Sequence, residues 1–360
     1  MTHASVPAAR PDPEPQAVLE PLTQAAVIMV VTCRPGGADP VRGLLEDLWG
    51  LVRSVGFRGP GDGLSCIVGL GSELWGRLFD GPRPPGLRPF RELRGRRHHA
   101  PSTPGDLLFH IRADRMDLCF ELAGVLTERL RGAADVVDEI QGFRYFDNRD
   151  LMGFVDGTEN PAGAKAARAA ILDAEDPFAG GSYVIVQKYL HDLASWNELP
   201  VEEQERVIGR TKLSDLELSD EAKPADSHVA LNTIEGPDGE ERQIVRLNMP
   251  FGSFAAGEFG TYFIGYCHTP EVIEEMLQNM FLGNPRGANH DRILDFSTAV
   301  TGTLFFVPAA DFLDELPDPP GSAAAAVPMP ASDPVPASVP DPVPGDGSLG
   351  VGSLKRSTLR

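Results

Sequence analysis

Apolar residues recur along the chain in paired segments, a short apolar run followed by a segment with helical spacing. The run Ala25–Cys33 is almost wholly apolar and rich in β-branched residues, which predicts a buried strand. In Pro40–Val55 apolar residues recur three and four positions apart, which predicts an amphipathic helix. The same succession returns at Leu107–Arg112 with Met116–Leu130, and at Thr261–Cys267 with a helix that begins after Thr269 and ends near Phe281.

The order of these segments predicts the fold class. Further strands are expected at Tyr183–Lys188 and Thr301–Val307, with helical segments to about Val207 after the first. No glycine-rich phosphate loop follows a strand, which disfavours a parallel α/β sheet. We therefore expect an α+β protein with two similar halves, residues 19–150 and 151–316, each with helices on one face of an antiparallel sheet.

Proline is concentrated near the end of the sequence. From Pro317 to Asp346 there are 10 prolines in 30 residues, a density that excludes helix and sheet and predicts an extended linker over 317–346. Residues 347–360 follow it and form either a frayed end or a peptide that binds a partner. Residues 1–18 are Pro-rich and polar, which predicts a disordered segment with no export signal.

Charge and cysteine content narrow the function classes. The formal net charge of −20 disfavours binding to nucleic acid or to anionic lipid. The longest strongly apolar run, Ala25–Val31, is far shorter than the roughly 20 residues of a membrane-spanning helix. The four cysteines are widely scattered and form no CxxC pair, so we expect reduced, buried thiols in a cytoplasmic protein.

Two segments carry candidate polar chemistry. In Gly153–Pro161, glycines flank Asp156 and could bring its carboxylate close to a ligand, or the segment is an ordinary Asp-Gly turn. Along the strand Gln243–Pro250, Arg246 and Asn248 share one face, because residues two apart in a strand point the same way. That face is either a solvated edge or a set of fixed donors lining a cavity.

Histidine chemistry is harder to place. His228 lies in a short polar segment, and His290–Thr298 contains two carboxylates, Asp291 and Asp295, that could orient a ligating imidazole. A structural histidine and a charged loop are the alternatives. His98 and His99 follow a basic stretch and are expected to be solvated.

Taken together, these segments resemble the B-type dye-decolorising peroxidases. The resemblance rests on Gly153–Pro161, His228, the run from Arg246 to Phe251 and the run from Asp291 to Pro308, in matching order and spacing. It implies two ferredoxin-like domains of the dimeric α+β barrel-like type, and one haem b bound without a covalent link in the second. The terminal run Gly347–Arg356 resembles the peptides that dock cargo proteins inside encapsulin nanocompartments.

The resemblance also implies roles for particular residues. His228 would be the proximal iron ligand, with Asp291 as the first choice for its carboxylate partner and Asp295 as the fallback. The polar residues on the distal side would be Asp156, Arg246 and Asn248, and the remaining cofactor-binding residues would be Arg210, as the partner of a propionate, with Gly157 and Thr158. Because proximal and distal residues lie on opposite faces of a porphyrin, we expect Asp226–Ala230 to form a loop or short helix and not to pair with the Arg246 strand.

The implied activity is reduction of hydrogen peroxide with oxidation of dyes, phenolic compounds or other bulky organic donors. In B-type relatives the arginine tends to matter more than the aspartate. The resemblance further implies a homo-oligomer inside an encapsulin shell in the cytoplasm. The alternative is a haem carrier or deferrochelatase-like protein, which would need His228 but no distal acid–base set.

Overall fold

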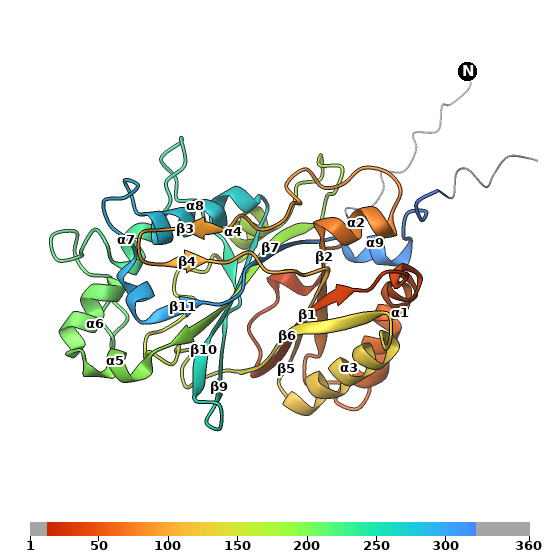
Figure 1. Cartoon of the computed structure of the whole chain (residues 1–360), viewed down its shortest axis with the longest axis horizontal. Coiled ribbons are helices and arrows are strands. Elements are labelled where there is room, and N and C mark those ends of the chain that lie inside the picture. The colour runs from red at the N-terminus through yellow and green to blue at the C-terminus, as the bar shows by residue number, and fades with distance from the viewer. Residues whose placement is uncertain (1–12, 322–360) are drawn as a thin grey trace, which may run out of the picture. The chain divides into compact units, whose positions relative to one another are not determined.

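The computed structural model describes residues 13–321 (Figure 1). The predicted terminal peptide 347–360, nearly all of the linker 317–346 and the first twelve residues lie outside this range. The described body is one compact unit. Within it, no helix is long and apolar enough to cross a membrane.

The N-terminal half follows a β-α-β-β-α-β order. Its main elements are β1 (Ala25–Cys33), α1 (Ala38–Gly56), β2 (Ser65–Gly71), β5 (Leu107–Ala113), α3 (Met116–Arg129) and β6 (Ala134–Phe143). The strands pair antiparallel in the order β6-β1-β5-β2, so the fourth strand of the half lies beside the first and the third beside the second. This is the arrangement of a ferredoxin-like domain.

The C-terminal half repeats that arrangement. Its strands are β7 (Ser182–His191), β8 (Val245–Arg246), β9 (Met249–Ser253), β10 (Glu258–Cys267), β11 (Ser297–Ala299) and β12 (Thr303–Val307). They follow the order β12-β7-β10-β8, again fourth, first, third and second when β8 and β9 count as one interrupted strand. The two halves join where β12 pairs with β2, so one sheet runs through both.

Shorter elements complete the described body. The helices are α2 (Ser72–Leu78), α4 (Ala164–Ala170), α5 (Leu193–Glu198), α6 (Val201–Ile208), α7 (His228–Asn232), α8 (Pro270–Leu282) and α9 (Ala310–Asp314). Two 3₁₀ turns, η1 (Ala17–Leu19) and η2 (Arg292–Asp295), and a small hairpin of β3 (Leu93–Arg94) and β4 (His99–Ala100) make up the rest.

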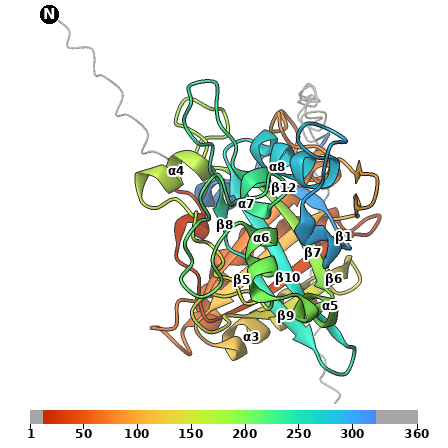
Figure 2. The same cartoon turned by 90° about the vertical axis from the view of Figure 1, so that its left-hand side faces the viewer.

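Both faces of the sheet are buried. Alternate residues of β1, such as Val27 and Met29, pack under α1 and α3, whereas Ala26 and Ile28 belong to a second core on the opposite face. This explains why the β1 sequence is continuously apolar instead of alternating. The sheet curls around the second core until β6 approaches β9: a Cβ atom on Gly142 would lie 2.6 Å from the Cβ atom of Met249. The predicted α+β fold, with helices on one face of a barrel-like sheet, is confirmed (Figure 2).

The predicted strands and helices are confirmed within a few residues, but two predicted boundaries are wrong. Gln16 is buried and its side-chain amide pairs with both backbone groups of Val68 in β2, so the folded body begins before residue 19. At the other end, the carbonyl of Pro317 accepts a hydrogen bond from Arg42, and that of Asp318 accepts one from the Asp80 amide. The body therefore extends two residues into the predicted linker.

Candidate active site

A cavity lies between the helix-bearing face of the C-terminal sheet and the helices α7 and α8. It encloses about 1410 Å³ that protein atoms do not fill, part of which is open to solvent. Apolar walls come from Ile244, Phe263, Ile273, Met276, Leu277 and Met280. Among the predicted site residues, the cavity is lined by Asp156, Gly157, Thr158, Arg210, His228, Arg246 and Asn248. Residues more than 90 positions apart in the sequence thus meet at one apolar space.

His228 is the first residue of α7, whose N-cap is Ser227. Its Nδ1 atom lies 2.7 Å from Oδ2 of Asp291. A carboxylate only accepts hydrogen bonds, so Nδ1 of the neutral ring holds the proton and the lone pair of Nε2 is left for a ligand. The expectation of a loop or short helix at Asp226–Ala230 is confirmed, and this segment does not pair with the Arg246 strand.

Asp291 is fully buried behind His228 and is held from both sides. Its Oδ1 atom accepts a hydrogen bond from the backbone N–H of Ile293 at 3.0 Å, and this bond caps η2. Its Oδ2 atom accepts hydrogen bonds from His228 and, at 3.4 Å, from the side-chain amide of Asn232. The first choice for the partner of His228 is therefore the one that the structure places there. Asp295 lies elsewhere, beside His98 and His290.

The other histidines in the described chain offer no free ring nitrogen to the cavity. His110 lies in the sheet and its Nδ1 atom contacts the Tyr266 hydroxyl at 2.9 Å. Burial lowers the pKa of His110 well below its usual range. His191 does line the cavity, but its Nδ1 and Nε2 atoms are taken by Ser297 and Thr261, at 2.8 and 3.0 Å.

Asp156 and Asn248 form a fixed polar pair across the cavity wall. The amide Nδ2 of Asn248 donates to the two carboxylate oxygens of Asp156, at 2.9 and 3.3 Å. Its Oδ1 atom accepts the backbone N–H of Ile264 in β10 at 3.1 Å. The side chain of Asn248 thus takes the place of a backbone carbonyl where the strand is interrupted between β8 and β9. That bond also sets which end of the amide faces Asp156.

Arg246 is positioned through its backbone. The side chain of Asn160 accepts the Arg246 N–H at 2.9 Å and donates to its carbonyl at 2.6 Å, as a neighbouring strand would. Among the described residues, the Arg246 guanidinium forms no hydrogen bond or ion pair with protein. The sequence left two interpretations of the face that carries Arg246 and Asn248, a solvated edge or a set of donors lining a cavity. The structure supports the second, because both residues line the cavity.

Arg210 already has protein partners. Its guanidinium binds Glu159 at 2.6 Å and Asp215 at 3.0 Å. The hydroxyl of Thr158 donates to the same Asp215, at 2.7 Å. Gly157 has a φ of +83°, a conformation that favours glycine, and this turn brings Asp156 to the cavity. A third carboxylate, Glu217, lies 3.8 Å from the Arg210 guanidinium. The predicted role of Arg210 toward a propionate therefore stays a prediction, because any further anion must share its guanidinium with three carboxylates.

Several cavity residues were not singled out from the sequence, among them His191 and Asp150. Burial lowers the pKa of His191 to about 4, so the ring is neutral at ordinary pH. Burial, with Asp156 nearby, raises the pKa of Asp150 to about 7. Their sequence surroundings contain no motif, and only the fold brings them to the cavity.

Comparison with known proteins shows which family the chain resembles along nearly all of its described length. The model of the N-terminal domain of Dyp-type peroxidases matches residues 15–144, and that of the C-terminal domain matches residues 147–312. The chain is 61% identical to a dye-decolorising peroxidase of Rhodococcus erythropolis over 346 residues, covering 95% of this chain and 97% of the relative. It is 58% identical to one of Mycobacterium tuberculosis over 348 residues, covering 96% and 98%.

Solved structures agree. The encapsulated DyP-type peroxidase from Mycobacterium smegmatis superposes with a TM-score of 0.83 at 63% identity, covering 86% of this chain and 100% of that one. DyPB from Rhodococcus jostii superposes with a TM-score of 0.82 at 56% identity, covering 84% and 98%. A variant of that protein was solved in complex with heme, and it matches with a TM-score of 0.82 at 55% identity, covering 86% and 100%.

Proposed function

The chain belongs to the Dyp-type peroxidase family, and from this premise we propose that its cavity binds one haem b, with His228 as the iron ligand, for the reduction of hydrogen peroxide. The organic donors are dyes, phenolic compounds or other bulky molecules. The observation that carries the proposal is the His228–Asp291 pair, with its 2.7 Å hydrogen bond, at the wall of a largely apolar cavity.

The residues present fit a haem. The Nδ1–H to carboxylate bond leaves Nε2 as a basic ligand atom, and a carboxylate partner raises the basicity of a ligating imidazole. Aliphatic and aromatic side chains of α8 and β10 supply walls for an apolar macrocycle. The four cysteines are all buried as free thiols, which agrees with a cofactor held without thioether bonds. When bound, haem supplies an iron that binds peroxide and stores oxidising equivalents for the donor.

Asp156 moves the proton. Its carboxylate accepts a proton from hydrogen peroxide and returns it to the oxygen that leaves as water, a service worth about 10²–10⁴-fold in rate. Asn248 keeps the carboxylate in one orientation by donating to it from a fixed amide. The acid–base group is therefore in place before peroxide arrives.

Arg246 stabilises the charge that develops on the departing oxygen. A guanidinium stays protonated at any working pH. Asn160 binds the Arg246 backbone, and the guanidinium forms no ion pair with any carboxylate among residues 13–321. Preorganised charge of this kind is usually the largest catalytic contribution of a site. A haem carrier or deferrochelatase-like protein would need His228 but not this set, so the Asp156–Arg246–Asn248 arrangement favours the peroxidase.

The binding proposal is tested by absorption spectroscopy on the full chain, with and without peroxide. Purified or haem-reconstituted protein should show a Soret band that shifts on peroxide addition. His228→Ala should bind haem at least about 10-fold more weakly and lose the protein-bound spectrum. His99→Ala removes a partly exposed histidine of β4 that does not line the cavity; it is the matched control and should behave as the parent. A parent chain that takes up no haem would contradict the proposal, as would an unchanged His228→Ala spectrum.

A second part of the proposal concerns packaging. We propose that Gly347–Arg356, outside the described residues, docks the enzyme inside an encapsulin shell in the cytoplasm. The similarity to an encapsulated relative at 63% identity supports this. The 10 prolines of residues 317–346 predict a linker between the body and this peptide.

Deletion of residues 345–360 tests the packaging. The truncated enzyme should keep its peroxide turnover, because the cavity lies wholly within residues 150–297, but should no longer co-purify with a co-expressed shell protein. Full-length enzyme is the control. Loading that survives the deletion would exclude the terminal peptide as the docking element.

A further inference from the structure

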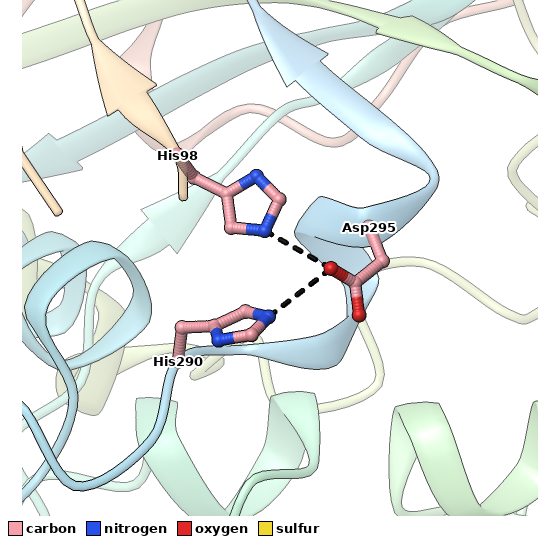
Figure 3. A group of neighbouring side chains, drawn as sticks. All are labelled: His98, His290 and Asp295. Carbon is pink, nitrogen blue, oxygen red and sulfur yellow. Dashed lines mark hydrogen bonds and ion pairs between the residues drawn. The ribbon is translucent and has the colours of Figure 1, made fainter. Parts of the chain in front are cut away.

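Three metal-ligating side chains gather outside the cavity, at His98, His290 and Asp295 (Figure 3). One ligand atom from each lies within 4.8 Å of the other two. The Nε2 atoms of both histidines lie 3.1 Å from the same carboxylate oxygen, Oδ1 of Asp295. The expectation that His98 is solvated is wrong, because its side chain keeps only 19% of its exposure and packs against His290.

We propose that these three residues bind a divalent transition-metal ion of the imidazole-preferring class, for which Zn²⁺ is the probe. Two imidazoles and one carboxylate are a ligand set that such ions favour, with the remaining positions taken by water. A metal bonded at about 2.1 Å holds neighbouring ligand atoms roughly 3.0–3.4 Å apart. The two nitrogen-to-oxygen separations, both 3.1 Å, already match this spacing.

The backbone that carries His98 is held in place. Gly95 and His98 close the turn between β3 and β4, with a 2.9 Å hydrogen bond from the Gly95 amide to the His98 carbonyl. A Cβ atom at Gly95 would lie 2.0 Å from the carbonyl oxygen of Phe281, so this turn packs directly on the end of α8. The site is thus built on packed segments and not on a free loop.

One cation lies close enough to compete. The Nη1 atom of Arg97 is 3.7 Å from Asp295, but the Arg97 side chain is 67% exposed. A surface arginine of this kind gains little from such a contact and can turn into solvent when a metal arrives. Arginine 97 is therefore no barrier to occupancy.

The proposed site joins the two halves of the molecule beside the proximal histidine. His98 belongs to the N-terminal half, whereas His290 and Asp295 flank Asp291, the partner of His228. A bound ion would restrain both ends of the short segment that positions Asp291. This consequence rests on the proposed role of His228, whereas metal binding itself does not.

The test is calorimetric titration of Zn²⁺ into the haem-loaded full chain, freed of any histidine tag and stripped with EDTA. We expect one site that is weakened more than about 10-fold in His98→Ala and in His290→Ala. His99→Ala, which removes the neighbouring imidazole, should bind as the parent does. Asp295→Asn keeps the side-chain shape and should also lose binding, which covers the case of a histidine variant that fails to fold.

Binding of Zn²⁺ with equal affinity by the parent, His98→Ala and His290→Ala would overturn the site, as would no binding at micromolar concentration. Amide hydrogen exchange supplies the second readout. Zn²⁺ should slow exchange over residues 291–296 in the parent and in His99→Ala but not in His290→Ala. Unchanged exchange in a parent that binds Zn²⁺ would overturn the restraint on Asp291, and loss of haem binding alone would count only against the proposed function.

Discussion

At the residue scale, Arg246 shows how a backbone contact serves a side chain. Asn160 pairs with both the N–H and the carbonyl of Arg246 and so fixes the start of its side chain at the edge of the sheet. The guanidinium then needs no protein anion to hold it in position. Its charge lies at the cavity without an ion pair among the described residues, which suits a charge-stabilising group.

Replacement of Arg246 by Leu should therefore slow the reaction with peroxide by about 10²–10³-fold. Asp156→Ala should slow it less, because water in the cavity can carry a proton whereas nothing replaces the lost cation. Stopped-flow measurement of the absorption change after mixing with hydrogen peroxide gives both rates. An unimpaired Arg246→Leu enzyme, or a larger loss in Asp156→Ala, would contradict this ranking.

Asp150 makes the stability of the folded protein depend on pH. Burial raises its pKa to about 7, and its Oδ1 atom accepts the backbone N–H of Phe154 at 3.0 Å. In the unfolded chain the same carboxyl ionises near pH 4. Since the folded state holds this proton more tightly, the stability that it contributes is full below about pH 4 and is lost as pH rises toward 7.

Asp150→Asn should remove the loss of stability that the parent shows as pH rises. Its amide oxygen keeps the bond from Phe154 and has no charge to desolvate, so the variant should gain on the parent by up to a few kcal/mol between about pH 4 and 7. Urea unfolding of both proteins at pH 4.5, 6 and 7.5 measures the difference. A difference that stays constant across these values would show that Asp150 does not titrate in this range.

The sequence predicts the candidate site better than its surroundings. His228, Asp156 and Arg246 stand in segments that resemble the family, and this resemblance singles them out where local pattern alone leaves a turn, a solvated edge or a structural histidine open. The choice of Asp291 over Asp295 depends on which carboxylate is buried behind α7, and the partners of Arg210 depend on a loop near Asp215. Such information is absent from local spacing, because it arises only when distant segments pack.

At the scale of elements, hydrophobic periodicity predicts a strand or helix correctly where the pattern arises from the burial of that element alone. The alternation of Val245, Leu247 and Met249 against Arg246 and Asn248 is real, since the first three are buried in the inner core and the other two face the cavity. The break between β8 and β9 was not predicted, because a side chain supplies the missing ladder bond. The strands β2 and β6 were also missed: β2 contains three polar or glycine positions, and most of β6 is exposed.

The contact between β2 and β12 is the seam that joins the halves. Gly69 in β2 leaves room for Phe305 of β12, and a Cβ atom at residue 69 would lie 2.9 Å from the Cβ atom of Phe305. Gly69→Ala should therefore destabilise the protein by about 1–3 kcal/mol through overpacking. Gly50→Ala is the matched control, because a Cβ atom at this exposed position of α1 meets nothing within 4 Å.

The control should be more stable than the parent by about 0.5–1 kcal/mol, as expected for alanine in a helix. Urea unfolding followed by fluorescence and by circular dichroism measures both variants. Because one sheet spans both halves, the two probes should report a single transition that Gly69→Ala shifts as a whole. Separate transitions, or equal stability of the two variants, would argue against the seam.

At the scale of the whole described body, two ferredoxin-like halves share the same strand order and one continuous sheet. The recurrence of strand–turn–helix segments predicts the duplication, but not the edge at which the halves meet. The pairing of that edge depends on the close packing of Gly69 against Phe305, and a pattern of hydrophobic and polar positions does not predict such a contact. The same holds for the approach of His98 to His290 across the halves.

The contact between β2 and β12 also determines how long β2 stays unpaired during synthesis of the chain. The strands of the N-terminal half are complete at Phe143, but the partner of β2 ends only at Val307. Ribosomes add roughly 5–20 residues per second, so the β2 edge waits about 10–30 s for its neighbour. During that interval a mostly apolar strand edge on each nascent chain is open to its neighbours on the same messenger. Slowing translation after β6 would lengthen this exposure and should lower the yield of folded enzyme.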